Sequence, residues 1–178
     1  MTRLGLIWSL VLSVALAGSI KANENAAPRL LPRPDVDGQL YAVNGFKLSK
    51  CSFEEETEVV LLFYSASWCF NCKQIAKTLK ELYPSIRKDH PAIEVVTYSM
   101  NESVSGRAEH LRGSDYPWPA IGPTASSKRA WQIEIPGGIP RFQAFKLNAT
   151  GMIAITPVGS VADVLQAVIA QQKIEKKT

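Results

Sequence analysis

The residues best suited to chemistry are two cysteines three positions apart, Cys69 and Cys72, within the run SWCFNCK. At the start of a helix, side chains three residues apart lie on nearly the same side, so the two sulfur atoms can meet in a short disulfide bond. The first cysteine would lie where unpaired backbone N–H groups and the positive end of the helix dipole stabilise a negative charge. We therefore expect Cys69 to be the thiolate nucleophile. Cys72 would attack second, on the mixed disulfide that Cys69 forms with a substrate.

Three other roles for such a pair are weaker. A zinc site needs four ligands, and the remaining candidates, Cys51, His90 and His110, lie in unrelated segments without the spacing of a zinc finger or ribbon. Covalent haem attachment needs a histidine directly after the second cysteine, where this chain has Lys73. A purely structural disulfide across two intervening residues would close too small a loop to add much stability. We expect a redox-active disulfide, with no metal and no other cofactor.

The segments on either side of the pair predict the elements that position it. An apolar run over residues 58–64 predicts a strand that is covered on both faces. Apolar side chains then recur at spacings of 4, 3 and 4 residues, at Ile75, Leu79, Leu82 and Ile86, which predicts one stripe of a helix from about residue 69 to 88. A second apolar strand at residues 93–98 completes a strand-helix-strand unit, which is expected to be parallel.

The rest of the chain extends this unit into one domain. We expect a short strand at residues 39–43 before an Asn44-Gly45 turn, and a helical connection at residues 102–111. A hairpin follows, with strands at 141–147 and 152–156, and the chain then forms an amphipathic helix that carries Val161, Val164, Leu165, Val168 and Ile169. This order predicts an α/β domain at residues 38–174 in which helices flank both faces of a central mixed sheet, followed by a polar tail at 175–178.

Composition limits the classes of function. The chain has 178 residues with 46% hydrophobic positions and 3 cysteines, which excludes a disordered chain and a disulfide-dense miniprotein. The formal charge is +4, from 20 Lys and Arg against 16 Asp and Glu, and these charges are scattered along the chain. We therefore expect no nucleic-acid partner.

The first residues predict a targeting segment. Residues 1–17 carry a positive charge at Arg3, an apolar stretch and a small-x-small ending, as in a secretory signal peptide. The apolar stretch has about 14 residues, short of the roughly 20 of a membrane-spanning helix, so cleavage is favoured over a permanent anchor. Residues 18–37 are interpreted as a flexible leader. We expect an exported protein with no membrane span after cleavage, in a periplasm or outside the cell, or in the lumen of the endoplasmic reticulum or secreted if the source is eukaryotic.

Together these features resemble the thioredoxin superfamily. The resemblance rests on the apolar strand followed by SASWCFNCK, on Gly138-Ile139-Pro140 before a hairpin, and on the carboxyl-terminal amphipathic helix. It covers about residues 38–172. The run YSASWC and the later Tyr116-Pro117-Trp118 are most similar to the tryparedoxin and nucleoredoxin branch, whereas the secretory signal is more similar to that of periplasmic thioredoxin-like reductases.

The resemblance implies a thioredoxin fold with Cys69 and Cys72 as the exchanging pair. It implies a cis peptide bond at Ile139-Pro140 facing the disulfide, and a substrate-binding surface formed by Trp68, Gly138, Ile139, Pro140 and Trp118. A preceding residue turned outward by a cis proline could pair with an extended client segment.

The chain also departs from the family pattern. Thioredoxins carry proline between the two cysteines, where this chain has Phe70-Asn71, so its redox potential cannot be taken from a relative. Many thioredoxins place a buried acid six positions before the first cysteine, and here that position is Phe63. Cys51 has no partner once the pair is closed, and we expect it to be buried as a small apolar residue.

The leading hypothesis is an extracytoplasmic thiol-disulfide oxidoreductase whose partners are client proteins with thiols or disulfides and an unidentified electron donor. Ile139 before Pro140 resembles the reducing thioredoxins, which favours a reductase. The alternatives are a non-catalytic binding module of the same fold, and a disulfide oxidant or isomerase.

Overall fold

The computed structural model describes residues 30–31, 38–124, 126, 138–149 and 151–175. The predicted signal peptide at 1–17 lies outside these residues, as do most of the predicted leader and, apart from Glu175, the predicted polar tail at 175–178. Leu30 and Leu31, within that leader, form a short strand paired with Met152 and Ile153.

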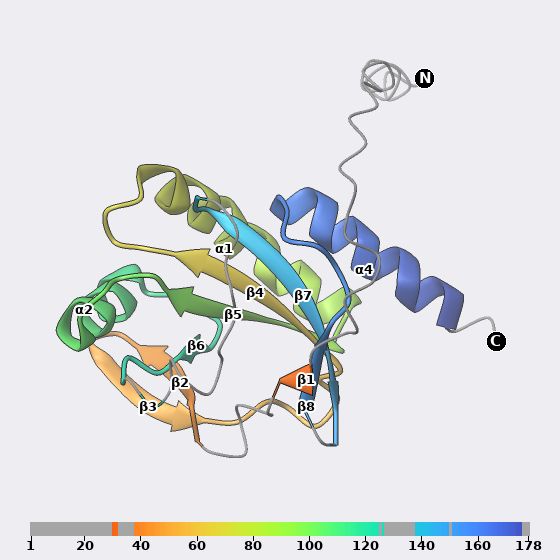
Figure 1. The fold of residues 1–178 in the computed structure, drawn as a ribbon, viewed down its shortest axis with the longest axis horizontal. Coiled ribbons are helices and arrows are strands. Elements are labelled where there is room, and N and C mark those ends of the chain that lie inside the picture. Colours follow the sequence, from red (N-terminus) through yellow and green to blue (C-terminus); the bar gives the residue numbers. More distant parts are fainter. Residues whose placement is uncertain (1–29, 32–37, 125, 127–137, 150, 176–178) are drawn as a thin grey trace, which may run out of the picture.

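The described chain forms one eight-stranded mixed sheet with helices packed against it (Figure 1). The strands lie in the order β1-β8-β7-β4-β5-β6-β2-β3. The pairs β4/β5 and β5/β6 are parallel and the others antiparallel. In chain order the elements are β1 (Leu30–Leu31), β2 (Leu40–Asn44), β3 (Lys47–Cys51), β4 (Val59–Ser65), α1 (Phe70–Asp89), β5 (Ile93–Ser99), α2 (Val104–Ser114), β6 (Ala120–Ile121), β7 (Arg141–Asn148), β8 (Gly151–Ala154) and α4 (Val161–Glu175).

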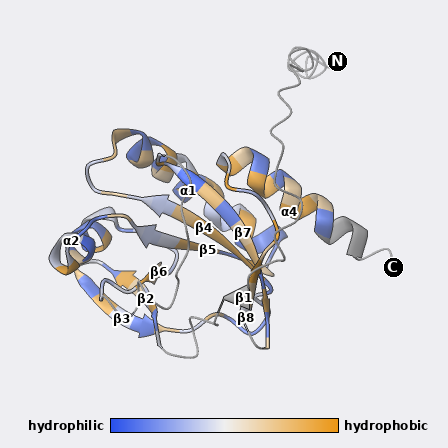
Figure 2. Cartoon of the chain, in the orientation of Figure 1, coloured by the Kyte–Doolittle hydropathy of each residue, from blue (hydrophilic) through white to orange (hydrophobic). Residues whose placement is uncertain are grey.

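The central strands β4 and β5 are buried at every residue, as the apolar runs predict. Figure 2 shows β4 in the orange of apolar residues over most of its length, whereas α4 alternates between orange and blue. The pairing of β4 with β5 is parallel, which confirms the predicted strand-helix-strand unit. The two strands end together, because Ser65 at the end of β4 lies opposite Ser99 at the end of β5.

The two faces of the sheet build separate cores. On one face, alternate residues of β4, among them Leu61 and Phe63, pack against the buried stripes of α1 and α4, which carry Leu79 and Val164. The opposite face has its own cluster, which includes Leu62, and this cluster contains no residue of α1, α2 or α4. The predicted mixed α/β sheet is therefore confirmed, and the described residues place helices in the core of one of its faces.

The apolar stripe of α1 differs from the predicted one at Leu82. Leu82 is 46% exposed, and the residue that turns toward the core is Tyr83. A helix turns about 100° per residue, so Tyr83 lies about 40° from the direction of Leu79 whereas Leu82 lies about 60° from it on the other side. The prediction for Leu82 was wrong because the stripe drifts around the helix.

The turn predicted at Asn44-Gly45 closes a hairpin. Asn44 pairs with Lys47, which leaves a two-residue loop of Gly45 and Phe46. Gly45 has φ +58°, a left-handed conformation that glycine adopts without steric cost. The sequence did not predict the second strand of this hairpin, β3.

Candidate active site

The cysteine pair lies where β4 passes into α1. Cys69 caps the amino end of α1, and its Sγ accepts a hydrogen bond from the backbone N–H of Cys72 at 3.1 Å. The two residues form a disulfide bond, with their Cα atoms 5.2 Å apart. Cys69 is 7% exposed and Cys72 is fully buried. Of the two residues, only Cys69 therefore keeps some exposed surface.

The surroundings of the pair stabilise negative charge at Cys69. The first turn of α1 contains no acidic residue, and it carries the cationic side chain of Lys73. Behind the pair, Phe63 is fully buried and stacks on Phe142 with ring centroids 4.7 Å apart. The absence of an acid at this position, noted from the sequence, therefore leaves Cys72 in an apolar core.

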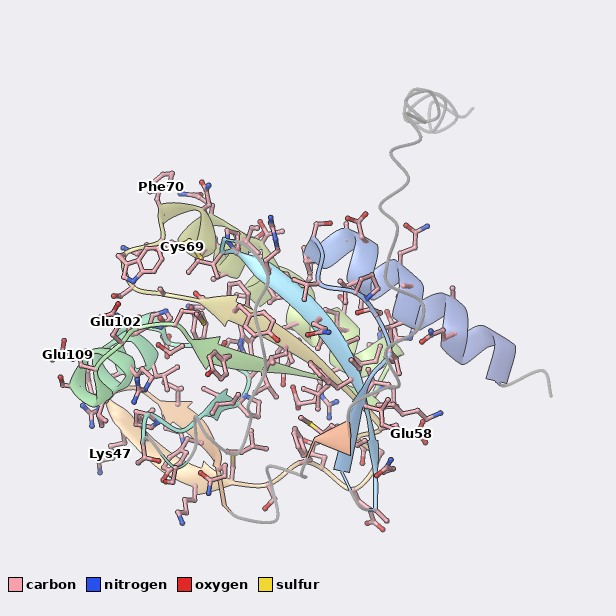
Figure 3. The ribbon with its side chains drawn as sticks, in the orientation of Figure 1. Lys47, Glu58, Cys69, Phe70, Glu102 and Glu109 are labelled. Atoms are coloured by element: carbon pink, nitrogen blue, oxygen red, sulfur yellow. A yellow bond between two sulfur atoms is a disulfide. The ribbon has the colours of Figure 1, made fainter. Side chains whose placement is uncertain are left out.

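A second segment reaches the disulfide from β7. The Ile139–Pro140 peptide bond is cis, as the resemblance implies, and the carbonyl oxygen of Ile139 lies 3.8 Å from Sγ of Cys69. Sheet register explains this contact, since Arg141 at the start of β7 lies opposite Tyr64 near the end of β4. Figure 3 shows Cys69 beside the start of β7, at the end of β4.

The surface around the pair combines apolar and polar groups. Trp68 and Phe70, on either side of Cys69, are 69% and 70% exposed, and Figure 3 shows Phe70 pointing away from the molecule. Gly138 is exposed at the same end of β7, with open space beside it. Next to the cis proline a groove of about 430 Å³ is lined by Asn71, Gln74, Ile75, Pro140, Arg141, Phe142, Ser160 and Val161. A client segment lying beside Cys69 would meet these groups.

Trp118 does not belong to this surface, although it was predicted as a substrate-binding residue. It is 1% exposed, stacks on Tyr116 and donates a hydrogen bond from Nε1 to Oγ1 of Thr97 at 2.8 Å. Its edge also contacts the ring of Tyr83 from α1. Trp118 is therefore a core residue, and burial keeps it from any client.

Sequence reasoning missed a set of polar groups beneath the loop between β4 and α1. The carboxamide of Asn101 holds Ser67 twice, because its Oδ1 accepts from the backbone N–H of Ser67 at 3.1 Å and its Nδ2 donates to Oγ of Ser67 at 2.7 Å. Ser99 lies within 3.4 Å of the same Oδ1 and within 2.9 Å of Nδ1 of His110.

His110 is the most unexpected member of this set. It is 6% exposed on α2, and burial, with a smaller contribution from the charge of Lys73, lowers the pKa of its imidazole to about 4. The ring is therefore neutral at pH 7. Its Nε2 lies 3.4 Å from the hydroxyl of Tyr116, which in turn lies 3.3 Å from Oγ of Ser65. The signal in the sequence was that serine ends both buried strands, since a buried hydroxyl needs a polar partner.

Cys51 lies apart from the pair, at the end of β3. It is free and half-buried, and it packs against the cluster on the opposite face of the sheet. Burial, and to a smaller extent the nearby carboxylate of Glu94, raises the pKa of the Cys51 thiol. It is thus less buried than predicted, and its thiol is poorly ionised at neutral pH.

The described ranges lack two other kinds of feature. No three His, Cys, Asp or Glu side chains there gather closely enough to hold a metal ion. No helix within those ranges has the length and apolar character needed to cross a membrane.

Comparison with known proteins places this geometry in a family. The thioredoxin-like family model matches residues 57–134, which include the whole β4–α1 junction and both cysteines. Over these residues the chain is thioredoxin-like. Among curated superfamily members it is similar to nucleoredoxin from Homo sapiens, at 28% identity over 110 residues, which is 61% of this chain and 24% of that protein. It is 29% identical over 96 residues to probable nucleoredoxin 1 from Arabidopsis thaliana, covering 53% of this chain and 16% of that one.

Solved structures of this superfamily have the same fold. Thioredoxin from Wuchereria bancrofti superposes with a TM-score of 0.52 at 22% identity, over 83% of this chain and 99% of its own. Tryparedoxin I from Leishmania major gives a TM-score of 0.51 at 16% identity, over 77% and 92% of the two chains. The relatives thus lie in the nucleoredoxin and tryparedoxin branch as well as among the thioredoxins. The chain spans about a quarter or less of the length of the nucleoredoxins it matches.

Proposed function

We propose that this chain is a thiol-disulfide oxidoreductase that exchanges its Cys69–Cys72 pair with cysteines of client proteins. The observation that carries the proposal is the unequal burial of two bonded cysteines at the start of α1, with Cys69 7% exposed and Cys72 fully buried behind it. This arrangement separates an attacking thiol from a resolving thiol.

We propose reduction of clients as its direction. The thiolate of Cys69 attacks one sulfur of a client disulfide, forming a mixed disulfide and releasing the other client sulfur as a thiolate. Cys72, after losing its proton, attacks Sγ of Cys69 and releases the second client thiolate. The client gains two electrons and two protons, and the pair is oxidised to the observed disulfide. A dithiol reductant must then return two electrons to the pair, and no further cofactor is needed.

The client would lie across the exposed surface beside the pair. Trp68 and Phe70 offer apolar contact, and the carbonyl oxygen of Ile139 beside Cys69 offers a hydrogen-bond acceptor to an extended backbone. The neighbouring groove carries the cationic side chain of Arg141. These groups favour a peptide segment that surrounds a disulfide over a small thiol alone.

The sharpest test traps the mixed disulfide in a chain without Cys51. In the Cys51→Ser background, Cys72→Ser should accumulate disulfide-linked clients that mass spectrometry identifies, because the resolving sulfur is missing. Cys69→Ser in the same background is the matched control and should trap none. Equal trapping by the Cys69→Ser variant would contradict the assignment of Cys69 as the attacking sulfur. No exchange by the Cys51→Ser protein with any protein disulfide would leave a binding module as the function.

Direction and location need their own measurements. Equilibration with glutathione gives the potential of the pair, and a value well above about −200 mV would favour an oxidant or isomerase instead. We propose an extracytoplasmic location, which the apolar segment at residues 1–17 supports. Sequencing the amino terminus of the protein recovered from an export compartment tests it, with cleavage after Ala17 as the expected result.

A further inference from the structure

A continuous series of polar contacts connects α2 to the loop that carries Cys69. It runs from the imidazole of His110 through Ser99 to the carboxamide of Asn101, which holds Ser67 two positions before the cysteine. A second arm runs from the same imidazole through Tyr116 to Ser65. Both arms begin at one buried ring; the first ends at Ser67 in the loop, and the second at Ser65, the last residue of β4.

When every contact of the first arm is a hydrogen bond, its donors and acceptors have one consistent order. The carboxamide oxygen of Asn101 must face the backbone N–H of Ser67, because its amino group would place two donors together. That oxygen only accepts, so the hydroxyl hydrogen of Ser99 is used in the 3.4 Å contact with it. Ser99 can then only accept from His110, at 2.9 Å, so the ring carries its proton on Nδ1.

The second arm fits the same tautomer. With the proton on Nδ1, Nε2 of His110 accepts from the hydroxyl of Tyr116 at 3.4 Å. The oxygen of Tyr116 is then free to accept from Ser65 at 3.3 Å. Each buried polar atom of the two arms therefore has a partner, and the neutral ring serves both arms at once.

The first arm is also fixed from outside. Arg107, 5% exposed on α2, donates from Nη1 to the carbonyl oxygens of Asn101 at 3.1 Å and of Glu102 at 2.6 Å. The backbone N–H of Met100 donates to the carbonyl oxygen of Ser65 at 2.7 Å. Asn101 is therefore held on its backbone side, so its side chain can restrain Ser67 instead of following it.

We propose that His110 is a positioning residue of the redox site, which acts through Ser99 and Asn101 to hold the loop before Cys69 against the amino end of α1. The restraint has most effect in the reduced protein, because the disulfide itself ties the loop to α1 in the oxidised protein. Loss of the first arm should therefore weaken the stabilisation of the Cys69 thiolate and favour the disulfide.

Two substitutions of His110 separate the arms. Asparagine places its amino group near the position of Nδ1, so His110→Asn can keep the donation to Ser99 and lose the contact with Tyr116. Glutamine reaches the position of Nε2, so His110→Gln keeps the contact with Tyr116 and loses that with Ser99. The two variants remove comparable amounts of ring and differ in the arm they preserve.

The measured quantities are the equilibrium of the Cys69–Cys72 pair with glutathione and the titration midpoint of the Cys69 thiol, followed by thiolate absorbance in a Cys51→Ser background. We expect His110→Gln and Asn101→Ala each to shift the equilibrium toward the disulfide by about fivefold, the effect of one hydrogen bond, and to raise the midpoint. His110→Asn should stay within about twofold of the parent protein, and the His110→Gln/Asn101→Ala double variant should shift no further than either single one.

A matched control distinguishes positioning from loss of stability. Leu111→Ala removes a fully buried side chain of the same helix, which packs against Val43 and Ala120 and not against the loop. It should lower stability and leave the equilibrium with glutathione unchanged. An equal shift in Leu111→Ala, additive effects in the double variant, or the reverse order of the Asn and Gln variants would overturn the proposal. The role of His110 bears on client reduction only if the proposed function is correct. The equilibrium of the pair with glutathione needs no client, so it can still be measured if trapping fails.

Discussion

Acid should destabilise this protein between pH 6.5 and pH 4 because of one buried imidazole. In the unfolded chain His110 titrates at its ordinary pKa of 6.5, whereas burial in the folded protein lowers the pKa to about 4. Between these values the unfolded chain binds a proton that the folded protein excludes, so stability falls as the pH falls. A separation of 2.5 pKa units corresponds to about 3 kcal/mol at full effect, and the part lost between pH 7.5 and 5.0 is about 2 kcal/mol.

The charge near the ring also favours a lowered pKa for His110. Burial lowers the pKa of His110, and the charge of Lys73 on α1 lowers it further. No carboxylate is among the causes of the shift. Glu94 opposes the trend in the whole protein, because burial raises the pKa of its carboxyl and the folded state then takes up that proton first.

The assay must therefore separate the two groups. Urea unfolding of the oxidised parent protein and of His110→Gln at pH 7.5 and 5.0 gives four free energies of unfolding. The loss of stability between the two pH values is calculated for each protein, and the two losses are then compared. Glu94 is present in both proteins, so its effect cancels. We expect the parent protein to lose about 2 kcal/mol more than His110→Gln over this range. Parallel losses in the two proteins would show that the folded imidazole binds protons as an exposed one does, and would refute the reasoning.

Three further predictions concern stability and reactivity. Leu79 is 1% exposed, so Leu79→Ala should lower the free energy of unfolding by about 2–5 kcal/mol. Leu82 is 46% exposed, so Leu82→Ala should lower it by under about 1 kcal/mol. Equal losses in urea unfolding would contradict the packing described. Gly45 has φ +58°, so Gly45→Ala should lower the free energy of unfolding by about 1 kcal/mol. Gly113 lies inside α2 with open space around it, so Gly113→Ala should raise this free energy by up to about 1 kcal/mol. Thermal unfolding compares the two variants, and a gain in stability at Gly45 would contradict the assigned conformation. Cys51 should react with iodoacetamide more slowly at pH 8 than an unfolded cysteine does, because burial raises its pKa, and equal rates by mass spectrometry would contradict this.

Local patterns sufficed for the centre of the fold. The apolar run at 58–64 and the cysteine spacing predicted the β4–α1 junction within a residue or two, because a strand covered on both faces leaves few alternatives. Leu30 and Leu31 could not be placed in the same way, since their strand exists only by pairing with β8, more than 100 positions later. Strand pairing at such a distance depends on the whole sheet and leaves no periodicity in the sequence.

The site was predictable where chemistry shows in residue type and was missed where it depends on burial. The spacing of the two cysteines predicted the disulfide, and the resemblance to the thioredoxin superfamily implied the cis peptide bond. Trp118 was predicted to bind substrate at the surface, and His110 was considered only as a candidate zinc ligand, yet both are buried. Their environments depend on how α2 and the segment after it pack against α1, and no local spacing reports that packing.

Burial also sets the order in which the two sulfurs react. The side chains that surround Cys72 on the α1 face are apolar, and Phe63 fills the position where a carboxyl could assist its ionisation. The nearby polar side chains of Ser99 and Asn101 do not assist this ionisation, because they hydrogen-bond to each other and to Ser67 in the loop. A thiol in an apolar core ionises reluctantly, whereas the thiol of Cys69 faces unpaired N–H groups at the amino end of a helix. In the proposed mechanism Cys69 therefore attacks first without an acid at position 63, and we expect the apolar surroundings of Cys72 to slow its loss of a proton.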